Sequence, residues 1–254
     1  MGLEAFSEAA FQKALQRTIR ALTRGKTIPD QPKAIILGGQ SGAGKTTIHR
    51  IKQNEFQGNL IIIDSDSYRS QHPNYLSLQE QFGKDSVDYT KGFAGKMVEY
   101  LVDELSTQGY HLLIEGSLRN IQVPRHIAQL LTSKGYQVSI AIIGTKPKLS
   151  YLSTLIRYEE LYAIDPTQAR ATPKEYHDGI VENLVDNLKE LESDKLFDQI
   201  QIYQRDRICI YDSETDEGSA AEILQECLFG KWSKVEEEML RVGEDRLRDL
   251  QKLK

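Results

Sequence analysis

Residues 33–50 read KAIILGGQSGAGKTTIHR, and this stretch decides the fold. Its middle holds the pattern G-x-x-x-x-G-K-T, formed by Gly39, Gly44, Lys45 and Thr46. An apolar run precedes the pattern and a polar run follows it, which is the strand–loop–helix context of a phosphate-binding P-loop, or Walker A motif. Glycines let the backbone curl so that N–H groups point at phosphate oxygens, and the helix N-terminus adds partial positive charge. The sequence therefore predicts a nucleotide site here.

The chemistry of the loop assigns roles to individual residues. We expect Lys45 to reach the β- and γ-phosphates and Thr46 to ligate Mg²⁺. The loop by itself fits ATPases, GTPases and kinases alike. The N-K-x-D and D-x-x-G motifs of GTPases do not occur in the expected order, which favours ATP. The residues expected to contact the nucleotide are Gly39, Gln40, Ser41, Gly42, Ala43, Gly44, Lys45, Thr46 and Thr47.

Outward from the loop, apolar runs alternate with helical patterns. Such alternation predicts an α/β fold with a mainly parallel sheet flanked by helices. Residues 65–90 are polar and predict irregular structure or short helices, and QIQIY and RICIY predict two strands in a hairpin or edge pair. We expect one domain over residues 1–254, with helical additions at the C-terminus. Strands are predicted at 33–39, 59–64, 110–116, 136–144, 199–203 and 207–211, and helices at 4–24, 46–55, 93–107, 124–134, 147–162, 174–192, 219–229 and 232–253.

The bulk composition excludes several classes of function. The formal net charge is −5, so nothing indicates general attraction to nucleic acid or to an anionic membrane. No apolar run approaches the roughly 20 residues of a membrane span, and the first residues lack a signal peptide's apolar region. We expect a cytoplasmic protein with no nucleic-acid partner. Cys209 and Cys227 have no metal-ligand spacing, and we expect both to be reduced thiols facing the core.

A kinase also needs a group that takes the proton of the acceptor hydroxyl. Asp64 and Asp66 follow the strand predicted at 59–64, and Glu115 follows the strand at 110–116. Open α/β sheets bind ligands at the carboxyl ends of their strands. We choose Asp66 as the base because it lies beyond the apolar strand, and Asp64 either supports the metal's water shell or caps a turn. The alternative is that both are solvated loop carboxylates.

Further polar residues surround this predicted edge. Glu115 is placed to bind a substrate hydroxyl or metal-bound water, and Ser117 and Arg119 follow it. The planar fork of Arg119 matches phosphate oxygens, which favours a phosphate-bearing substrate. Arg157 and Arg170 bracket a segment suited to neutralising a phosphoryl group in transfer. Taken singly, each of these two arginines fits a surface ion pair better.

Several stretches together resemble the zeta toxin family, and the resemblance covers nearly the whole chain. The phosphate loop alone is weak evidence for this family, whereas the combined set in this order is highly specific. The matching stretches are LGGQSGAGKTTIHRIKQ (37–53), IIIDSDSYRSQHPNY (61–75), DYTKGFAGKMVE (88–99), LLIEGSLR (112–119), YLSTLIRYEELY (151–162) and ARATPKEYHD (169–178).

The resemblance implies a small-molecule-kinase-like fold and a specific reaction. Zeta toxins use ATP and Mg²⁺ to phosphorylate UDP-N-acetylglucosamine at the 3′-hydroxyl of the amino sugar, which blocks early peptidoglycan synthesis. A cognate antitoxin inhibits them by covering the nucleotide site. An acceptor that is another sugar or nucleoside metabolite stays open from the residues alone, as does a nucleotide-dependent binding module with little turnover.

The resemblance also assigns residues. It implies Asp66 as the general base, with Lys45 serving ATP and with Arg157 and Arg170 clamping the transferring phosphate. The positions that match substrate contacts are Asp66, Glu99, Glu115, Ser117 and Arg119. By pattern alone Glu99 is a solvated helix acid, so its role rests on the resemblance. Ser117 stands where threonine is common in the family, and it keeps the hydroxyl.

Overall fold

The computed structural model describes residues 2–166 and 169–252, and its centre is one mixed sheet. Across these residues the strand order is β2-β3-β1-β4-β5-β6, with every pair parallel except the antiparallel β5 and β6. The predicted α/β fold with a mainly parallel sheet is confirmed, and so is the terminal strand pair. The strands are β1 (Lys33–Gly38), β2 (Ile61–Ile63), β3 (Leu112–Glu115), β4 (Gln137–Gly144), β5 (Gln199–Gln204) and β6 (Cys209–Asp212).

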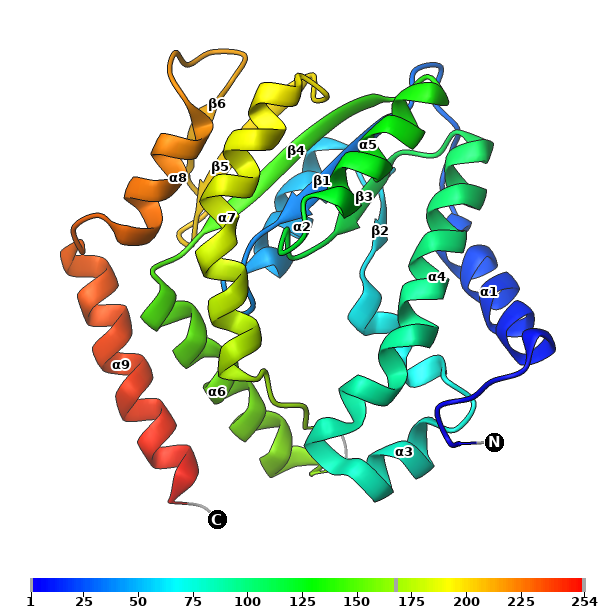
Figure 1. Ribbon diagram of the computed structural model, residues 1–254, viewed down its shortest axis with the longest axis horizontal. Coiled ribbons are helices and arrows are strands. Elements are labelled where there is room, and N and C mark those ends of the chain that lie inside the picture. Colours follow the sequence, from blue (N-terminus) through cyan, green and yellow to red (C-terminus); the bar gives the residue numbers. More distant parts are fainter. Residues whose placement is uncertain (1, 167–168, 253–254) are drawn as a thin grey trace.

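Helices cover both faces of the sheet (Figure 1), with α5 and α7 on the near side and α2 on the far side in this view. The α-helices are α1 (Glu8–Thr23), α2 (Lys45–Glu55), α3 (Tyr75–Phe82), α4 (Val87–Gln108), α5 (Gln122–Ser133), α6 (Pro147–Ile164), α7 (Lys174–Asp194), α8 (Ala220–Phe229) and α9 (Lys234–Gln251). Two 3₁₀ helices, η1 (Ser65–Gln71) and η2 (Gly83–Ser86), lie between β2 and α4.

Alternation along each strand divides the core in two. Ile36 and Ile114 face the larger core, which α1, α4, α5, α7 and α8 close. Leu37 and Leu113 face the smaller core on the opposite side, where Ile48 of α2 packs against them. Side chains of a strand alternate between the two faces, so a parallel strand covered on both sides is apolar throughout. This arrangement anchors α2, and with it the loop before α2, directly against the centre of the sheet.

Two expectations need adjustment at helix starts. The first helix was expected from residue 4 but begins at Glu8, because the Ser7 side chain accepts a hydrogen bond from the Ala10 N–H and caps it. The polar stretch 65–90 contains η1, α3 and η2, and α4 already begins at Val87 rather than at 93. This segment crosses the carboxyl end of β2 and therefore positions the acids that follow that strand.

The expectation that both cysteines face the core is wrong for Cys209. Cys227 is buried on α8, but Cys209 is exposed because β6 is an edge strand. Neither forms a disulfide. Over residues 2–166 and 169–252, no helix combines the length and the apolar character needed to cross a membrane.

Candidate active site

The phosphate loop connects β1 to α2 in a conformation that depends on glycine. Gly42 has a φ of +74°, and a Cβ there would lie 2.0 Å from the carbonyl oxygen of Ser150 on α6. Gly39 has a φ of +142°, and its Cβ would lie 2.7 Å from the carbonyl oxygen of Ile143. No L-residue with a side chain fits so close to neighbouring backbone. The loop is thus pressed tightly between the sheet and α6.

The main-chain donors of the loop suit an anionic ligand. Gly44 occupies the N-cap position of α2 and provides no side-chain cap for the first turn. The N–H groups of Ser41, Gly42 and Gly44 have no acceptor among the described residues, while the Ala43 N–H turns back to Gln40 O. Unpaired amides at a helix N-terminus favour phosphate oxygens. The sequence-predicted loop therefore has the geometry of a phosphate cradle.

Lys45 and Thr46 stand at the start of α2, where the nucleotide chemistry was expected. The Lys45 Nζ donates to Gly39 O at 3.0 Å and to Gln40 O at 3.3 Å, so the side chain folds back over the loop. Its ammonium also lies 3.7 Å from Glu115 Oε1. Thr46 is exposed, and Thr47 continues the first turn with its N–H on Gly44 O.

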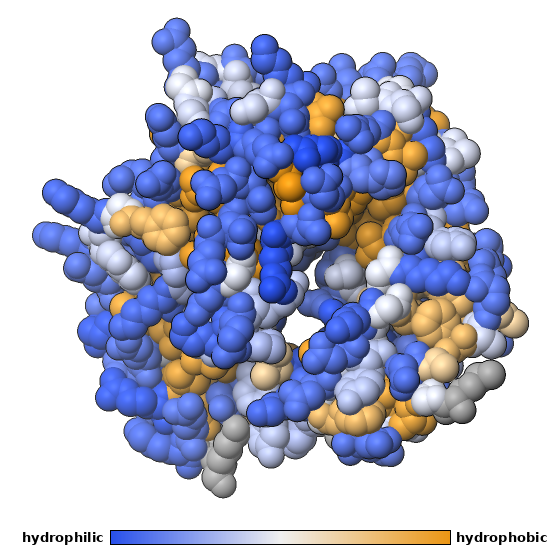
Figure 2. All heavy atoms as spheres, viewed as in Figure 1, coloured by the Kyte–Doolittle hydropathy of each residue, from blue (hydrophilic) through white to orange (hydrophobic). Residues whose placement is uncertain are grey.

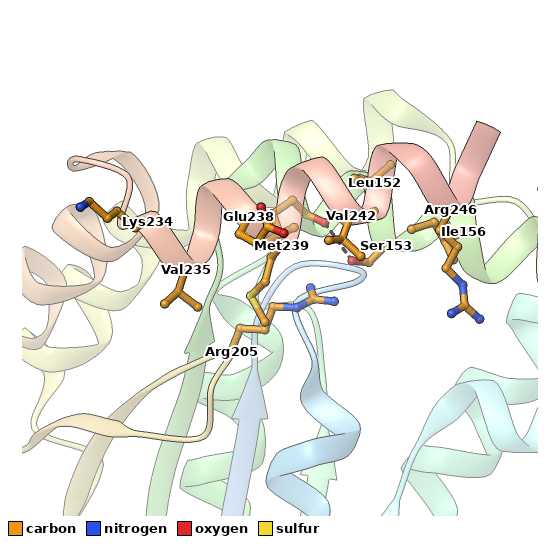
Figure 3. Close-up of a pocket in the computed structure, with 12 residues that line it drawn as sticks. Leu152, Ser153, Ile156, Arg205, Lys234, Val235, Glu238, Met239, Val242 and Arg246 are labelled. Carbon is orange, nitrogen blue, oxygen red and sulfur yellow. Dashed lines mark hydrogen bonds between the residues drawn. The ribbon is translucent and has the colours of Figure 1, made fainter. Parts of the chain in front are cut away.

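Two side chains from other elements support the loop from outside. Thr145 follows β4, and its hydroxyl donates to Ala43 O at 2.9 Å. Arg205 follows β5, and its Nη1 donates to Gly42 O at 2.8 Å. Figure 3 shows Arg205 reaching toward the loop beneath α9, and Met239 and Val242 project from α9 into the same space. They line a cavity of about 500 Å³ between α6 and α9, so the C-terminal helix adjoins the outer side of the loop.

The two aspartates after β2 have different environments. Asp64 caps η1, since its carboxylate accepts the Asp66 N–H at 3.0 Å and the Ser67 hydroxyl at 2.9 Å. Burial and the negative charge of Glu115 raise the pKa of Asp64 above its usual value. Of the two roles left open for Asp64, these contacts show the turn cap.

Asp66 is the more accessible of the pair, with 60% of its side chain exposed. Its Oδ1 accepts the Arg69 Nε–H at 2.7 Å, and Arg69 is held in turn by Val87 O and by the Thr90 hydroxyl oxygen on α4. Desolvation pushes the pKa of Asp66 upward, but the hydrogen bond and charge of Arg69 outweigh it and hold the pKa below its usual value. Asp66 is therefore an oriented, ionised carboxylate at neutral pH.

Glu115 lies beside the phosphate loop because β3 is the neighbour of β1, with Glu115 opposite Leu37. Its Oε2 lies 2.8 Å from His49 Nε2, and its Oε1 lies 3.7 Å from Lys45 Nζ. Only 18% of the Glu115 side chain is exposed. The carboxylate thus lies beside the lysine of the phosphate loop, a closer association than the spacing in the sequence revealed.

The loop after β3 holds Ser117 and Arg119 at the same edge. Between them, Leu118 is buried with a φ of +55°, an unusual conformation for a residue with a side chain. Asn187 of α7 fixes this backbone by donating to Leu118 O at 2.8 Å. Arg119 is exposed and its guanidinium carbon lies 5.1 Å from the centre of the Tyr176 ring, so the loop packs against α7.

Arg157 and Arg170 both act on the carboxylate of Asp66. Arg157 is exposed on α6 and Arg170 is half-buried before α7, and the positive charges of both lower the pKa of Asp66. Figure 2 shows a hollow ringed mainly by hydrophilic side chains, between α7 and α4 and beside η1 in the view of Figure 1. Glu99 is exposed on α4, and the described part of the chain shows no hydrogen bond or ion pair that joins it to the other candidates.

Sequence reasoning missed three residues that touch the site. His49 lies one helical turn after Lys45, so the i, i+4 spacing already placed both on one face of α2. Arg69 follows Asp66 by three residues, which is pairing distance on a helical turn. Arg205 carried no such signal, since 160 residues separate it from Lys45 in the sequence and only the parallel pairing of β4 with β5 brings it to the loop.

Comparisons with known proteins agree with this arrangement. The family model described as Zeta toxin matches residues 18–216. The chain is 65% identical to Toxin PezT of Streptococcus pneumoniae, over 98% of this chain and 99% of the relative. It is 40% identical to Toxin zeta of Streptococcus pyogenes, over 90% of this chain and 80% of that protein.

A solved structure from the PezAT chromosomal toxin–antitoxin system of Streptococcus pneumoniae superimposes with a TM-score of 0.93. It is 63% identical and covers 98% of this chain and 100% of the solved chain. The family match spans most of the sequence and includes the loop, the carboxylates and the arginines described above. The chain therefore belongs to the zeta toxin family.

Proposed function

We propose that this chain is the toxin of a toxin–antitoxin pair and an ATP- and Mg²⁺-dependent kinase. Its acceptor is UDP-N-acetylglucosamine, phosphorylated at the 3′-hydroxyl of the amino sugar, so that peptidoglycan synthesis stops. The observation that carries the kinase part is a phosphate cradle at the end of β1 together with an ionised Asp66, which follows β2 in the same sheet and lies in the field of Arg157 and Arg170. The acceptor rests on family membership. Residues 1–254 act as one kinase domain in this proposal.

The proposed chemistry is an in-line transfer. An oxygen of the Asp66 carboxylate accepts the proton of the acceptor hydroxyl while that hydroxyl oxygen bonds to the γ-phosphorus. The bond from the γ-phosphorus to the β–γ bridging oxygen breaks, and ADP leaves. Lys45, Arg157 and Arg170 neutralise the charge that spreads over the transferring oxygens. A carboxylate with a lowered pKa suits this step, because a loose transition state needs an oriented acceptor more than a strong base.

The donor set at the loop fits Mg²⁺. Among the residues that the structure describes, no cluster of three or more His, Cys, Asp or Glu side chains is placed to hold a metal ion. Mg²⁺ in nucleotide sites does not need one, since it keeps several waters and takes its remaining ligands from phosphates and a side chain or two. The exposed Thr46 hydroxyl would hold the ion, which would neutralise charge on the β- and γ-phosphates.

Substrate contacts and the partner complete the proposal. Glu99, Glu115, Ser117 and Arg119 bind the sugar nucleotide, with Arg119 on its diphosphate. Glu115 is the best supported of these, because it already lies at the loop's lysine. An antitoxin partner is supported by the relative from a toxin–antitoxin system, and the proposal that this partner covers the nucleotide site rests on family membership.

The decisive assay is direct. The purified chain is incubated with ATP, Mg²⁺ and UDP-N-acetylglucosamine, and a product heavier by one phosphate is sought by mass spectrometry. A panel of other sugars and nucleosides separates this acceptor from another metabolite. Intact protein that phosphorylates only a different acceptor refutes the substrate, and one that transfers phosphate to none of them refutes the kinase. Adding EDTA should abolish transfer and be reversed by Mg²⁺.

A further inference from the structure

A buried chain of polar side chains leads away from the phosphate loop. The Gln40 side chain is completely buried, and its Nε2 donates to Thr145 O and, at 3.3 Å, to the Ser150 hydroxyl oxygen on α6. The Ser150 Oγ lies 2.8 Å from His177 Nε2 on α7, and His177 Nδ1 lies 3.1 Å from Asp178 Oδ1. Ser150 and His177 are at most 1% exposed. This line of hydrogen bonds therefore joins the phosphate loop, α6 and α7, and it reaches solvent only at Asp178.

The hydrogen positions follow from the partners. An ionised carboxylate only accepts, so His177 Nδ1 carries the hydrogen that points to Asp178. Burial lowers the pKa of His177 below its usual value, and the imidazole is neutral, which leaves Nε2 as an acceptor. The Ser150 hydroxyl has one hydrogen, which goes to Nε2 at 2.8 Å rather than to Pro147 O at 3.0 Å, and its oxygen accepts from Gln40. All links thus run in one direction.

The position of this chain in the fold gives it a function. Ser150 is also where the loop backbone packs on α6, because Gly42 has room for no Cβ against Ser150 O. Arg157 lies seven residues further along the same helix, and Arg170 lies seven residues before His177. The connection between α6 and α7 is thereby tied at both helices to the loop that cradles phosphate. Apart from these hydrogen bonds, the described part of α6 makes few contacts with α7 compared with those it makes with α9.

We propose that His177 and Ser150 are positioning residues that fix Arg157 of α6 and Arg170, which precedes α7, relative to the phosphate loop. They touch neither nucleotide nor acceptor. They act by holding Gln40 in the loop and the start of α7 in one register, so that Arg157 and Arg170 face the γ-phosphate when the loop is loaded. The activity readout below rests on the proposed kinase function, whereas the exchange readout does not.

The test uses the full chain and three variants. Ser150→Ala removes the central hydroxyl, His177→Leu removes the ring nitrogens, and His177→Gln restores a polar atom near the position of Nε2. Thr18→Val is the matched control, since Thr18 is a buried residue of α1 whose hydroxyl lies 2.9 Å from Ala14 O and from Gln71 Oε1 at the end of η1. For each variant, kcat, the KM for ATP, the melting temperature and the hydrogen–deuterium exchange of residues 36–48 are measured.

We expect Ser150→Ala and His177→Leu to lower kcat about 10- to 100-fold with a smaller change in the KM for ATP, because misplacement of charged groups raises the barrier to transfer. Both should speed exchange in the loop, and His177→Gln should recover part of each effect. Thr18→Val should lower the melting temperature only. If Ser150→Ala and His177→Leu match Thr18→Val in both kcat and loop exchange, the positioning role is wrong. If the unaltered protein transfers no phosphate, the kinase proposal fails. The hydrogen–deuterium exchange of the loop then still decides whether Ser150 and His177 have the positioning role.

Discussion

Replacing Asp66 by Asn gives the sharpest test of the proposed chemistry, because it separates catalysis from stability. The change removes the negative charge that accepts the hydroxyl proton but keeps an oxygen facing the Arg69 Nε–H. Loss of a general base costs about 10²–10⁴ in rate. At about 1.4 kcal/mol for each factor of ten, this is roughly 3–6 kcal/mol of transition-state stabilisation.

The expected cost in stability is much smaller. The Asp66 side chain is 60% exposed, and its ion pair with Arg69 spans one helical turn. Exposed pairs at this spacing contribute about 0.3–0.5 kcal/mol. Since 1 kcal/mol shifts the melting temperature by about 2–4 °C in a chain of this size, Asp66→Asn should move it by less than about 2 °C.

The assay compares phosphoryl transfer, ATP affinity and melting temperature in Asp66→Asn and in a matched control. Asp88→Asn is that control, because Asp88 forms an exposed ion pair with Lys91 at the same spacing on α4, 3.3 Å between Oδ1 and Nζ. Both variants should melt alike and bind ATP alike, and only Asp66→Asn should lose transfer. Transfer that persists in Asp66→Asn at the rate of the Asp88→Asn control would refute the assignment of the base.

Three further outcomes are expected. Gly42→Ala should weaken ATP binding in calorimetry and lower the melting temperature, because its Cβ would lie 2.0 Å from Ser150 O. The control is Gly25→Ala, which has a φ of +71° and open space around it, so it should show only the effect of backbone strain. Glu115→Gln should raise the KM of the acceptor roughly 10- to 100-fold, the range of a hydrogen bond to a charged group, and leave ATP affinity equal or tighter in calorimetry because Lys45 loses a competing anion. Burial lowers the pKa of His111 in the folded protein, so at a pH between its folded and unfolded pKa values the unfolded protein binds more protons. The free energy of unfolding should therefore fall as the pH drops through about 6.5. Urea titrations of His111→Asn should show a weaker fall, and a fall equal to that of the unaltered protein would contradict this.

The sequence indicated the elements well where a single physical signal governs them. The strand–loop–helix around Lys45 was predicted to within one residue at the start of α2, because the glycine pattern and the apolar run both act locally. The polar stretch 65–90 was predicted only as irregular or short helical. Its 3₁₀ helices η1 and η2 pack on α4, and α3 packs on η1 and η2, so the local composition does not specify them.

The sequence by itself determined the chemistry of this protein: a phosphate loop, acids at strand ends and a family pattern that runs through the chain. These follow from residue types at fixed short spacings, which the chain carries in any conformation. Only the tertiary structure decided which groups meet. The order β2-β3-β1-β4-β5 places Glu115 beside Lys45 and Arg205 beneath the loop, and the packing of α6 on α7 joins Ser150 to His177. Such pairings depend on strand order and helix packing, which are collective outcomes of burial rather than properties of any one segment.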